Sequence, residues 1–401
     1  MDRTILHCDC NSFFASVETL LAPSLADGPT AVCGDPESRH GIILAKNEKA
    51  KAFGVQTAET IWQAKRKCPD LRLVAPHRSE YVKFSRKCNE LYLQYTDLVD
   101  PFGIDESFLD VTGSMHLFGS GEHIADELRR RMREEVGLTI SVGVSFNRAF
   151  AKLGSDYKKP DGTTVFSREN FKQRVWSLPA NTLLYVGKRA SDRLNRLGVR
   201  TIGELAACDP AFIHSILGKN GDLLLRYARG EDDEPVRSFY AEREVKSVGN
   251  SMTFAHNLLG ADECRMGITA LCDNVGRRLR KRGMVCQLGI RDPEFHNRSR
   301  QITLERPTNS TRALIDLSMQ LLLGHWPMDK PVRLLSVTAA NLLPENQSCE
   351  QLSLFDAAED IQKRDRQHKL DQTVDALRQK FGDQSVVFAH SVKKKDKTDK
   401  K

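Results

Sequence analysis

The spacing of apolar and polar residues in the N-terminal part of the chain predicts alternating strands and helices. Short apolar runs between polar residues are typical of buried strands, and apolar positions three and four residues apart are typical of helices. We therefore expect strands at 3–9, 97–104, 106–111 and 139–144, and helices at 13–21, 79–95, 121–136 and 147–157. Asn11 and Ser12, two common helix-capping residue types, precede the first helix.

Residues 26–75 form a smaller unit inserted into this series, with expected strands at 30–33 and 41–45 and a helix at 60–67. Without the insertion, the order is close to β-α-β-β-α-β, the ferredoxin-like pattern, in which an antiparallel sheet carries helices on one face. In that topology the strands at 3–9 and 106–111 are neighbours at the centre of the sheet.

The C-terminal half predicts two further folded parts and a polar tail. Residues 168–230 are helical, and 183–188 with 197–205 resemble a helix-hairpin-helix, in which Gly187 and Lys188 could approach a phosphate. After a polar linker near 231–245, residues 246–344 form an αβ unit with strands at 285–291, 300–304 and 333–343. The tail holds one amphipathic stretch, at Leu370, Val374, Leu377 and Phe381, and a lysine-rich end that we expect to be disordered.

Composition limits the class of protein. A chain of 401 residues indicates several domains, and a net charge of +7 permits a polyanionic partner without requiring one. The ten cysteines are scattered and lack zinc-ligand spacing, so we interpret them as reduced thiols of a cytosolic protein. The sequence has neither a signal-peptide pattern nor an apolar run long enough for a membrane span.

Three acidic residues lie in or beside the two central strands. Asp9 ends the run at 3–9, and Asp105 and Glu106 interrupt the apolar run that continues to Leu109. One such Asp is more often a turn or capping residue, which is our interpretation of Asp110. Three carboxylates brought together would need cations, and hard oxygen ligands suit Mg²⁺. Because neighbouring strand residues point to opposite faces, Asp105 and Glu106 can share a site only if the backbone bends there.

A basic run near the end of an expected helix is the other charged feature. It comprises Arg277, Arg278, Arg280, Lys281 and Arg282. Such a run is either a solvated helix face or a phosphate-binding surface for nucleic acid, and the sequence leaves both interpretations open.

Several motifs together resemble the Y-family translesion DNA polymerases, in particular the bacterial DNA polymerase IV branch. They are Asp9 to Glu18, Asp105-Glu106, residues 45–55 ending in Phe53-Gly54-Val55, and Ser155-Asp156 with Lys159-Pro160-Asp161-Gly162. The resemblance implies a multidomain α+β right-hand fold with a ferredoxin-like palm. It places the palm at 1–10 and 76–166, the fingers at 11–75, the thumb at 167–232, a linker at 233–240, the little finger at 241–345 and a tail at 346–401.

The resemblance also implies roles for single residues. Asp9, Asp105 and Glu106 would be the catalytic metal-binding carboxylates, with the main-chain carbonyl of Cys10 completing the shell of one of two Mg²⁺ ions, for which Mn²⁺ could substitute. Phe14 would be the steric gate against ribonucleotides. The remaining substrate contacts would be Phe13, Lys51 and Lys159.

The sequence departs from the family at four positions, one of which is Asn11, where an acidic residue that is not an essential ligand is frequent. Glu48 replaces a tyrosine that contacts the triphosphate, and we expect its carboxylate to turn away from phosphate. Lys51 stands where arginine is common, and Tyr185 replaces the first glycine of the thumb hairpin. None of these departures removes a metal-binding carboxylate.

The segment at 351–355 in the tail is similar to the peptide that binds the bacterial sliding clamp. Its anchor residues would be Gln351, Leu352, Leu354 and Phe355. The expected protein is therefore a monomeric, template-directed DNA polymerase of the bacterial cytoplasm, low in fidelity and without proofreading, that binds primer–template DNA, deoxynucleoside triphosphates and the clamp. A nucleotide cyclase and a non-catalytic DNA- or clamp-binding accessory protein are the alternatives.

Overall fold

A computed structural model of the chain describes residues 2–35, 41–282, 284–293, 297–303, 307–344, 358–383 and 385–387. The chain forms two compact units, Met1–Glu242 and Arg243–Lys401, each with its own hydrophobic core. No helix in the described part of the chain is both long and apolar enough to cross a membrane.

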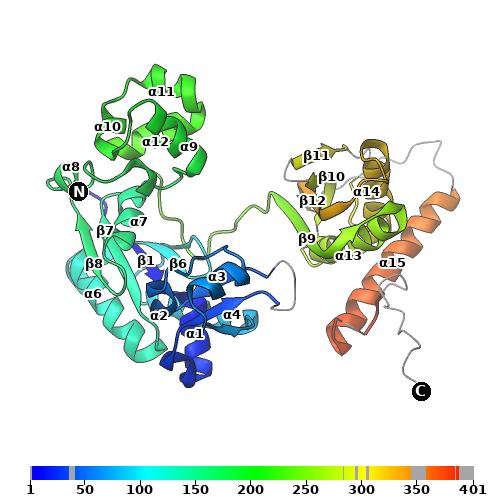
Figure 1. Ribbon diagram of the computed structural model, residues 1–401, viewed down its shortest axis with the longest axis horizontal. Coiled ribbons are helices and arrows are strands. Elements are labelled where there is room, and N and C mark those ends of the chain that lie inside the picture. The colour runs from blue at the N-terminus through cyan, green and yellow to red at the C-terminus, as the bar shows by residue number, and fades with distance from the viewer. Residues whose placement is uncertain are drawn as a thin grey trace. The chain divides into compact units, whose positions relative to one another are not determined.

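The first unit is built on a five-stranded sheet in the order β5-β6-β1-β7-β8 (Figure 1). Its strands are β1 (Ile5–Cys10), β5 (Val99–Pro101), β6 (Glu106–Asp110), β7 (Ile140–Ser145) and β8 (Thr163–Phe166). Strand β1 lies between β6 and β7 and is antiparallel to both, which confirms that the first strand and the strand after Asp105 are neighbours. The parallel edge strand β8 was not expected, and β5 is shorter than the predicted strand at 97–104.

Helices cover both faces of this sheet, so the prediction of one covered face was wrong. In β7, the apolar residues Ile140, Val142 and Val144 alternate with the small residues at 141, 143 and 145. The apolar side packs in one core with α1 (Phe13–Leu21), α4 (Arg78–Tyr92) and α6 (Gly121–Arg131). On the small-residue side, α7 (Arg148–Tyr157) approaches so closely that a Cβ on Gly143 would lie 1.9 Å from the Ala151 carbonyl oxygen.

The inserted unit is a three-stranded sheet in the order β3-β2-β4 with two short helices. Its elements are β2 (Thr30–Cys33), β3 (Ile43–Lys46), α2 (Glu48–Ala52), α3 (Ile61–Lys67) and β4 (Arg72–Val74). The predicted helix at 60–67 is confirmed as α3. It begins after Thr60 because the Thr60 side chain and Gln63 form a capping box there. Five residues are too few to show a helical period, which is why α2 was not predicted.

Residues 171–229 are helical, as expected. The helices are α8 (Phe171–Arg174), α9 (Lys188–Arg196), α10 (Ile202–Ala207), α11 (Pro210–Leu217) and α12 (Lys219–Arg229). Shorter elements of the first unit are the 3₁₀ turns Pro23–Asp27, Thr112–Ser114 and Ala180–Thr182, the helix α5 (Met115–Phe118) and the π-helical turn Met132–Val136. Beyond α12, one Asp232 carboxylate oxygen accepts the backbone N–H groups of Arg148 and Ala149, so this segment caps the N-terminus of α7.

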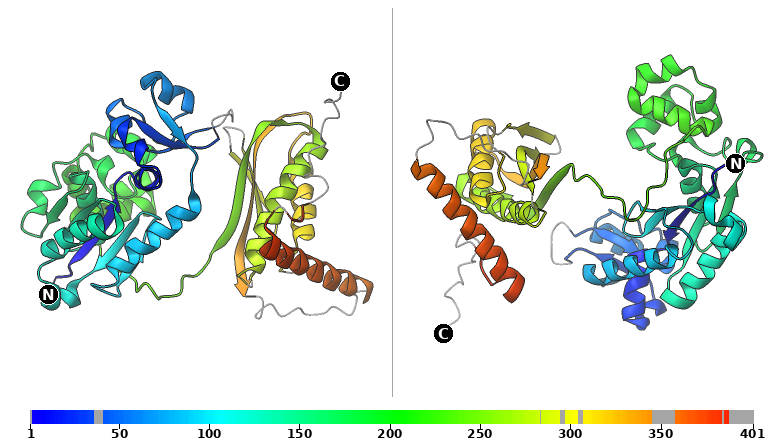
Figure 2. Two further views of the ribbon diagram at one scale, coloured as in Figure 1. Left: turned by 90° about the horizontal axis from the view of Figure 1, so that it is seen from below. Right: turned by 180° about the vertical axis from the view of Figure 1, so that it is seen from behind.

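The second unit is a four-stranded antiparallel sheet in the order β11-β10-β12-β9, with α13 and α14 on one face (Figure 2). Its elements are β9 (Ser247–Leu258), α13 (Gly260–Arg280), β10 (Met284–Pro293), β11 (Asn297–Gln301), α14 (Thr311–His325) and β12 (Val332–Pro344). The amphipathic stretch of the tail belongs to a helix, α15 (Ala358–Phe381), which packs against α13.

Candidate active site

The register of the central sheet places two of the predicted carboxylates side by side. Asp9 in β1 is the direct antiparallel partner of Glu106 in β6. Asp105 lies in the turn before β6, where its carbonyl oxygen accepts the N–H of Cys10 at 2.9 Å. The N–H groups of Phe102 and Gly103 both donate to the Glu106 carbonyl, which closes the turn. The backbone therefore bends at the acidic pair, as a shared site for Asp105 and Glu106 requires.

Two lysines occupy the space between these carboxylates. Lys152, from α7, places its Nζ 2.9 Å from Asp9 and 2.7 Å from Glu106. Lys159 places its Nζ 2.9 Å from Asp9 and 2.7 Å from Asp156. Both ammonium groups therefore act as internal counter-ions for the acidic cluster.

The carboxylates of the acidic pair have opposite pKa shifts. Burial, followed by the charges of Asp9 and Glu106, raises the pKa of Asp105 to about 6. Burial also disfavours the charged form of Glu106, but its interactions with the neighbouring His7 ring and with the Lys152 ammonium group outweigh burial and lower the pKa of Glu106 to about 2. The charge of Lys152 offsets the raised pKa of Asp105 only in part.

His7 completes the cluster from the same face of β1 as Asp9. Its ring is fully buried, with Nδ1 2.8 Å from the Ser155 hydroxyl and Nε2 3.3 Å from Glu106. Burial lowers the pKa of His7, so the imidazole is neutral near pH 7. His7 and Lys152 were not predicted from the sequence, although the i, i+2 spacing of His7 and Asp9 on one strand was an available signal.

The donor set fits a divalent cation. His7, Asp9 and Glu106 each have a ligand atom within 4.8 Å of the others, and Asp105 adds a carboxylate beside them. The thiol of Cys10 lies in the core, 3.9 Å from the sulfur of Cys88, so only its main-chain carbonyl is available as a ligand. Hard oxygen donors of this kind suit Mg²⁺ and similar ions.

The aromatic residues after Asp9 divide between the core and the half-exposed surface. Phe13 is 2 % exposed and belongs to the main core, so its burial does not favour the predicted substrate contact. Phe14 is half-buried, and its ring stacks on Tyr81 with centroids 4.2 Å apart and planes inclined by 14°. Tyr81 is itself fixed, because its hydroxyl donates to the buried Glu18 carboxylate.

The structure places Lys51 on the short helix α2. Its Nζ lies 3.4 Å from the Glu48 carboxylate, and both side chains are about half exposed. The other Glu48 oxygen accepts the hydroxyl of Ser12, at the turn between β1 and α1. The Glu48 carboxylate therefore points toward Ser12 and neutralises part of the Lys51 charge.

Gly187 caps the N-terminus of α9, and Lys188 is its first residue. A Cβ at Gly187 would meet nothing within 4 Å, so the backbone there is open to approach. Tyr185 adopts a positive φ of 67°, a conformation that glycine would occupy without strain.

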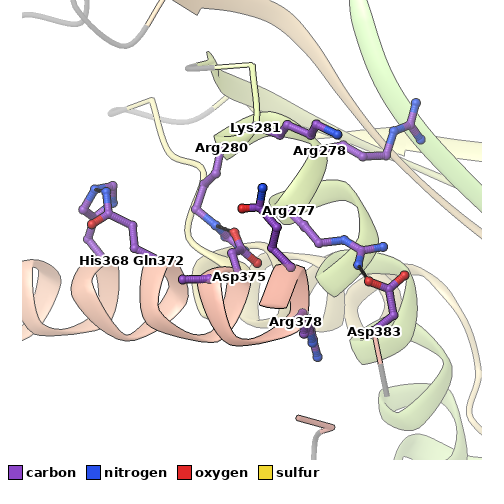
Figure 3. Close-up of a pocket in the computed structure, with 11 residues that line it drawn as sticks. Arg277, Arg278, Arg280, Lys281, His368, Gln372, Asp375, Arg378 and Asp383 are labelled. Carbon is purple, nitrogen blue, oxygen red and sulfur yellow. Dashed lines mark hydrogen bonds and ion pairs between the residues drawn. The ribbon is translucent and has the colours of Figure 1, made fainter. Parts of the chain in front are cut away.

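Part of the basic run at the end of α13 forms ion pairs with the tail helix α15 and the residues just after it (Figure 3). Arg280 is buried and pairs with Asp375 and Asp371 of α15, and Arg277 pairs with Asp383. Arg278 donates to the Gly249 carbonyl, whereas Lys281 and Arg282 are exposed. Of the five basic residues in this run, Arg280 therefore lies inside the unit rather than on its surface.

The fold is that of the Y-family DNA polymerases. A solved Y-family DNA polymerase chimera superimposes with a TM-score of 0.76 over 85 % of this chain and 99 % of its own length, at 23 % identity. The impB/mucB/samB family matches residues 8–156, and its C-terminal domain matches 245–354.

Curated relatives share nearly the whole length of the chain. DNA polymerase IV of Acetivibrio thermocellus is 46 % identical over 96 % of both chains. DNA polymerase IV 1 of Bacillus subtilis is 34 % identical over 98 % of this chain and 94 % of its own. The chain therefore belongs to the impB/mucB/samB family, in the branch of the proteins named DNA polymerase IV.

Residues 351–355, which contain the predicted clamp-binding peptide, lie outside the described residues.

Proposed function

We propose that this DNA-directed DNA polymerase transfers deoxynucleotides at the cluster formed by Asp9, Asp105 and Glu106. The observation that carries the assignment is the pairing of Asp9 with Glu106 across β1 and β6, with Asp105 in the turn beside them. The three carboxylates and the Cys10 carbonyl would hold two Mg²⁺ ions, or Mn²⁺ in their place. When bound, the ions would activate the primer 3′-hydroxyl and neutralise the triphosphate and the leaving pyrophosphate.

Protein side chains would supply the remaining positioning. Lys159 pairs with Asp9 of the carboxylate cluster, and Lys51 pairs with Glu48, which accepts the Ser12 hydroxyl. These positions support the proposal that both lysines hold the β- and γ-phosphates. A phosphate would compete with carboxylates for these ammonium groups. Phe14, supported by the Tyr81 ring, would exclude a ribose 2′-hydroxyl by collision. Positioning and charge stabilisation together supply most of the catalysis in such a site.

The family architecture assigns four parts to the chain. We propose that the palm comprises 1–10 and 76–166, the fingers 11–75, the thumb 167–232 and the little finger 241–345, joined by a linker at 233–240. The central sheet, the inserted three-stranded sheet, the helices α8–α12 and the four-stranded sheet support this division.

Duplex DNA would be held through its backbone. Gly187 and Lys188 at the start of α9 and the exposed Lys281 and Arg282 are the candidate contacts among the predicted residues. We add the sheet face of the second unit that points away from α13, since Ser336 pairs there with Ser251. Hydroxyl groups commonly bind phosphate oxygens without reading sequence.

We further propose a translesion role with low fidelity and no proofreading, which membership of this family supports. The protein would act as a monomer in the bacterial cytoplasm and bind the sliding clamp through Gln351, Leu352, Leu354 and Phe355. Bacterial relatives and the sequence of 351–355 support these assignments.

The test is primer extension on an undamaged primer–template with Mg²⁺ and all four deoxynucleotides. We expect extension by wild type, loss of at least about a thousandfold in Asp105→Ala/Glu106→Ala, and wild-type activity in the control Asp70→Ala, an exposed acid away from the cluster. Phe14→Ala should in addition admit ribonucleotides.

The same assay separates the alternatives. DNA binding without extension by wild type would favour a non-catalytic accessory protein. Cyclic product formed from a nucleotide without template would favour a cyclase.

A further inference from the structure

Helix α15 is attached to its unit mainly by charged groups. Arg280 of α13 forms a two-point contact with Asp375, at 2.7 and 3.2 Å, and lies 3.4 Å from Asp371. In the opposite direction, Arg378 of α15 contacts both oxygens of Asp273 in α13, at 2.9 and 2.8 Å. These reciprocal ion pairs fix the helix at two points along its length.

Asp371 also ties α15 to a second helix. Its carboxylate accepts the N–H of Thr311, the first residue of α14, at 3.0 Å. A carboxylate at a helix N-terminus is stabilised by the free N–H groups and the helix dipole there. One side of α15, defined by Asp371, Asp375 and Arg378, therefore has fixed partners on both α13 and α14.

The contact between the helices is polar rather than close-packed. A cavity of about 670 Å³ remains between α15 and the end of α13, lined by charged and polar groups including Arg278, Lys281, Gln372 and Gln379 (Figure 3). Asp371 and Arg378 are 7 % and 5 % exposed, whereas Leu370 and Phe381 of the same helix are 55 % and 63 % exposed. The usual distribution of apolar and charged residues is reversed in α15.

The exposed apolar residues form one stripe. Leu370, Leu377 and Phe381 are exposed and Val374 between them is partly exposed; the four follow the 4-3-4 spacing that aligns side chains along a helix, within a sector of roughly 60° at 100° per residue. The docked side centres roughly 90° away, so α15 can hold its own unit and present the stripe at the same time. The far border of the stripe is basic, with Arg366, Lys369 and Lys380 all exposed.

We propose that this stripe is a second docking surface for the sliding clamp, acting together with Phe355 and its neighbours. This inference rests on the clamp contact in the proposed function. Because α15 begins three residues after Phe355, a partner that captures the peptide is brought to the start of the helix. For its charge to complement this basic border, the partner would need an apolar groove with acidic residues along its edge.

A second copy of the chain is a poorer occupant. In an antiparallel pair of α15 helices, the same border of each stripe faces itself, so Arg366, Lys369 and Lys380 would meet their own copies. Like charges at such positions are destabilising. Charge complementarity therefore favours a partner with acidic flanks.

The two contacts would act as one bivalent attachment. After the peptide binds, the stripe engages at a high effective concentration, so a weak second contact adds strongly to the overall affinity. Since α15 is fixed to α13 and α14, the clamp would also take a defined orientation relative to the second unit.

The test measures binding of full-length protein to a purified bacterial sliding clamp by biolayer interferometry. We compare wild type with Leu370→Ala/Leu377→Ala/Phe381→Ala, with Phe355→Ala, and with Gln372→Ala/Gln379→Ala, a control at exposed polar positions on the side of the same helix opposite the stripe. We expect at least about tenfold weaker binding for the stripe variant and less than about twofold change for the control. Circular dichroism and thermal unfolding of the stripe variant should match wild type, because the replaced side chains are exposed.

Each other outcome overturns the inference in a distinguishable way. Equal clamp affinity of wild type and stripe variant removes the second docking surface and leaves the proposed function intact. No clamp binding by wild type removes both the peptide contact and this inference. A wild-type dimer, seen by light scattering and lost in the stripe variant with unchanged clamp affinity, assigns the stripe to a second copy.

Discussion

At the scale of single residues, the site combines two acids whose charges have close cationic partners with one, Asp105, whose charge is compensated only in part. Lys152 and Lys159 neutralise Asp9, and Lys152 with His7 stabilises the charge on Glu106. Asp105 keeps a raised pKa because burial and two negative neighbours act on it together. A cation bound beside Asp105 would stabilise its charged form, so the stability of the folded protein and metal binding should be linked at this residue.

Asp105→Asn should stabilise the metal-free protein at neutral pH but not in acid. The pKa of Asp105 is raised in the folded state from 3.8 to about 6, so its charged form costs stability above about pH 6 and nothing once both states are protonated below about pH 4. The two-unit shift corresponds to roughly 2 to 3 kcal/mol at most. Urea unfolding in EDTA at pH 3.5 and 7.5 measures the difference; an equal gain at both values would contradict it.

Lys152→Met should strengthen binding of a divalent cation while destabilising the protein without metal. The ammonium of Lys152 shares oxygen atoms of Asp9 and Glu106 that a cation would use, so the two cations compete. Removing it leaves partly buried carboxylates uncompensated, at a cost of about 2 kcal/mol or more. Titration calorimetry with Mn²⁺ and thermal unfolding in EDTA test both effects, with exposed Lys158→Met as the control. Weaker Mn²⁺ binding would show that Lys152 supports the ions instead.

At the scale of elements, the sequence predicts the strands and helices with clear periods, and it fails where contacts distant in sequence decide. Strands β1, β6 and β7 and helices α1, α4 and α7 lie close to their predicted ranges. The bend at Asp105 depends on hydrogen bonds to Cys10 and within 102–106, which no local pattern specifies. Likewise, the sequence of α15 is polar, and the partners that hold this helix in place, Asp273 and Arg280, lie about 100 residues earlier in the chain. Its packing could therefore not be predicted from the local sequence.

Gly143→Ala should displace α7 and the side chains that α7 brings to the site. The added Cβ would lie 1.9 Å from the Ala151 carbonyl and 2.5 Å from the Ser155 nitrogen, both backbone atoms of that helix. We expect a loss of about 3 kcal/mol or more in stability, because overpacking against backbone cannot be relieved by a rotamer change. Chemical unfolding measures it, with Gly113→Ala as the control, since a Cβ there meets nothing within 4 Å. Similar stability of the two variants would refute the close approach.

At the scale of the whole molecule, two compact units imply two cooperative units of unfolding. The first holds the core of the five-stranded sheet and further clusters in the helices α7–α12 and in the inserted sheet, and the second holds one core between the four-stranded sheet and helices α13 and α14. The C-terminal family match begins at 245, close to the boundary between the units.

Calorimetry should therefore resolve two thermal transitions that respond to different substitutions. Leu109→Ala, at a position with 0 % exposure in the first unit, should lower one transition, and Leu335→Ala, at 1 % exposure in the second, should lower the other. Each change removes about 2 to 5 kcal/mol of stability from its own unit. A single transition that shifts for both variants would show instead that the units unfold together.

The buried cysteines allow the opening of each unit to be followed by chemical labelling. Cys8, Cys10 and Cys88 lie in the first core, and Cys264 and Cys272 lie in the second. Burial raises the pKa of Cys8, and contact with Cys88 followed by burial raises that of Cys10, so neither thiol ionises in the folded protein. The thiolate attacks an alkylating reagent and displaces its leaving group, so a reagent such as iodoacetamide would modify each core only as often as that core opens. The labelling rate of each thiol, followed by mass spectrometry of its peptide, would then report how often each unit of the polymerase opens under the conditions in which it copies DNA.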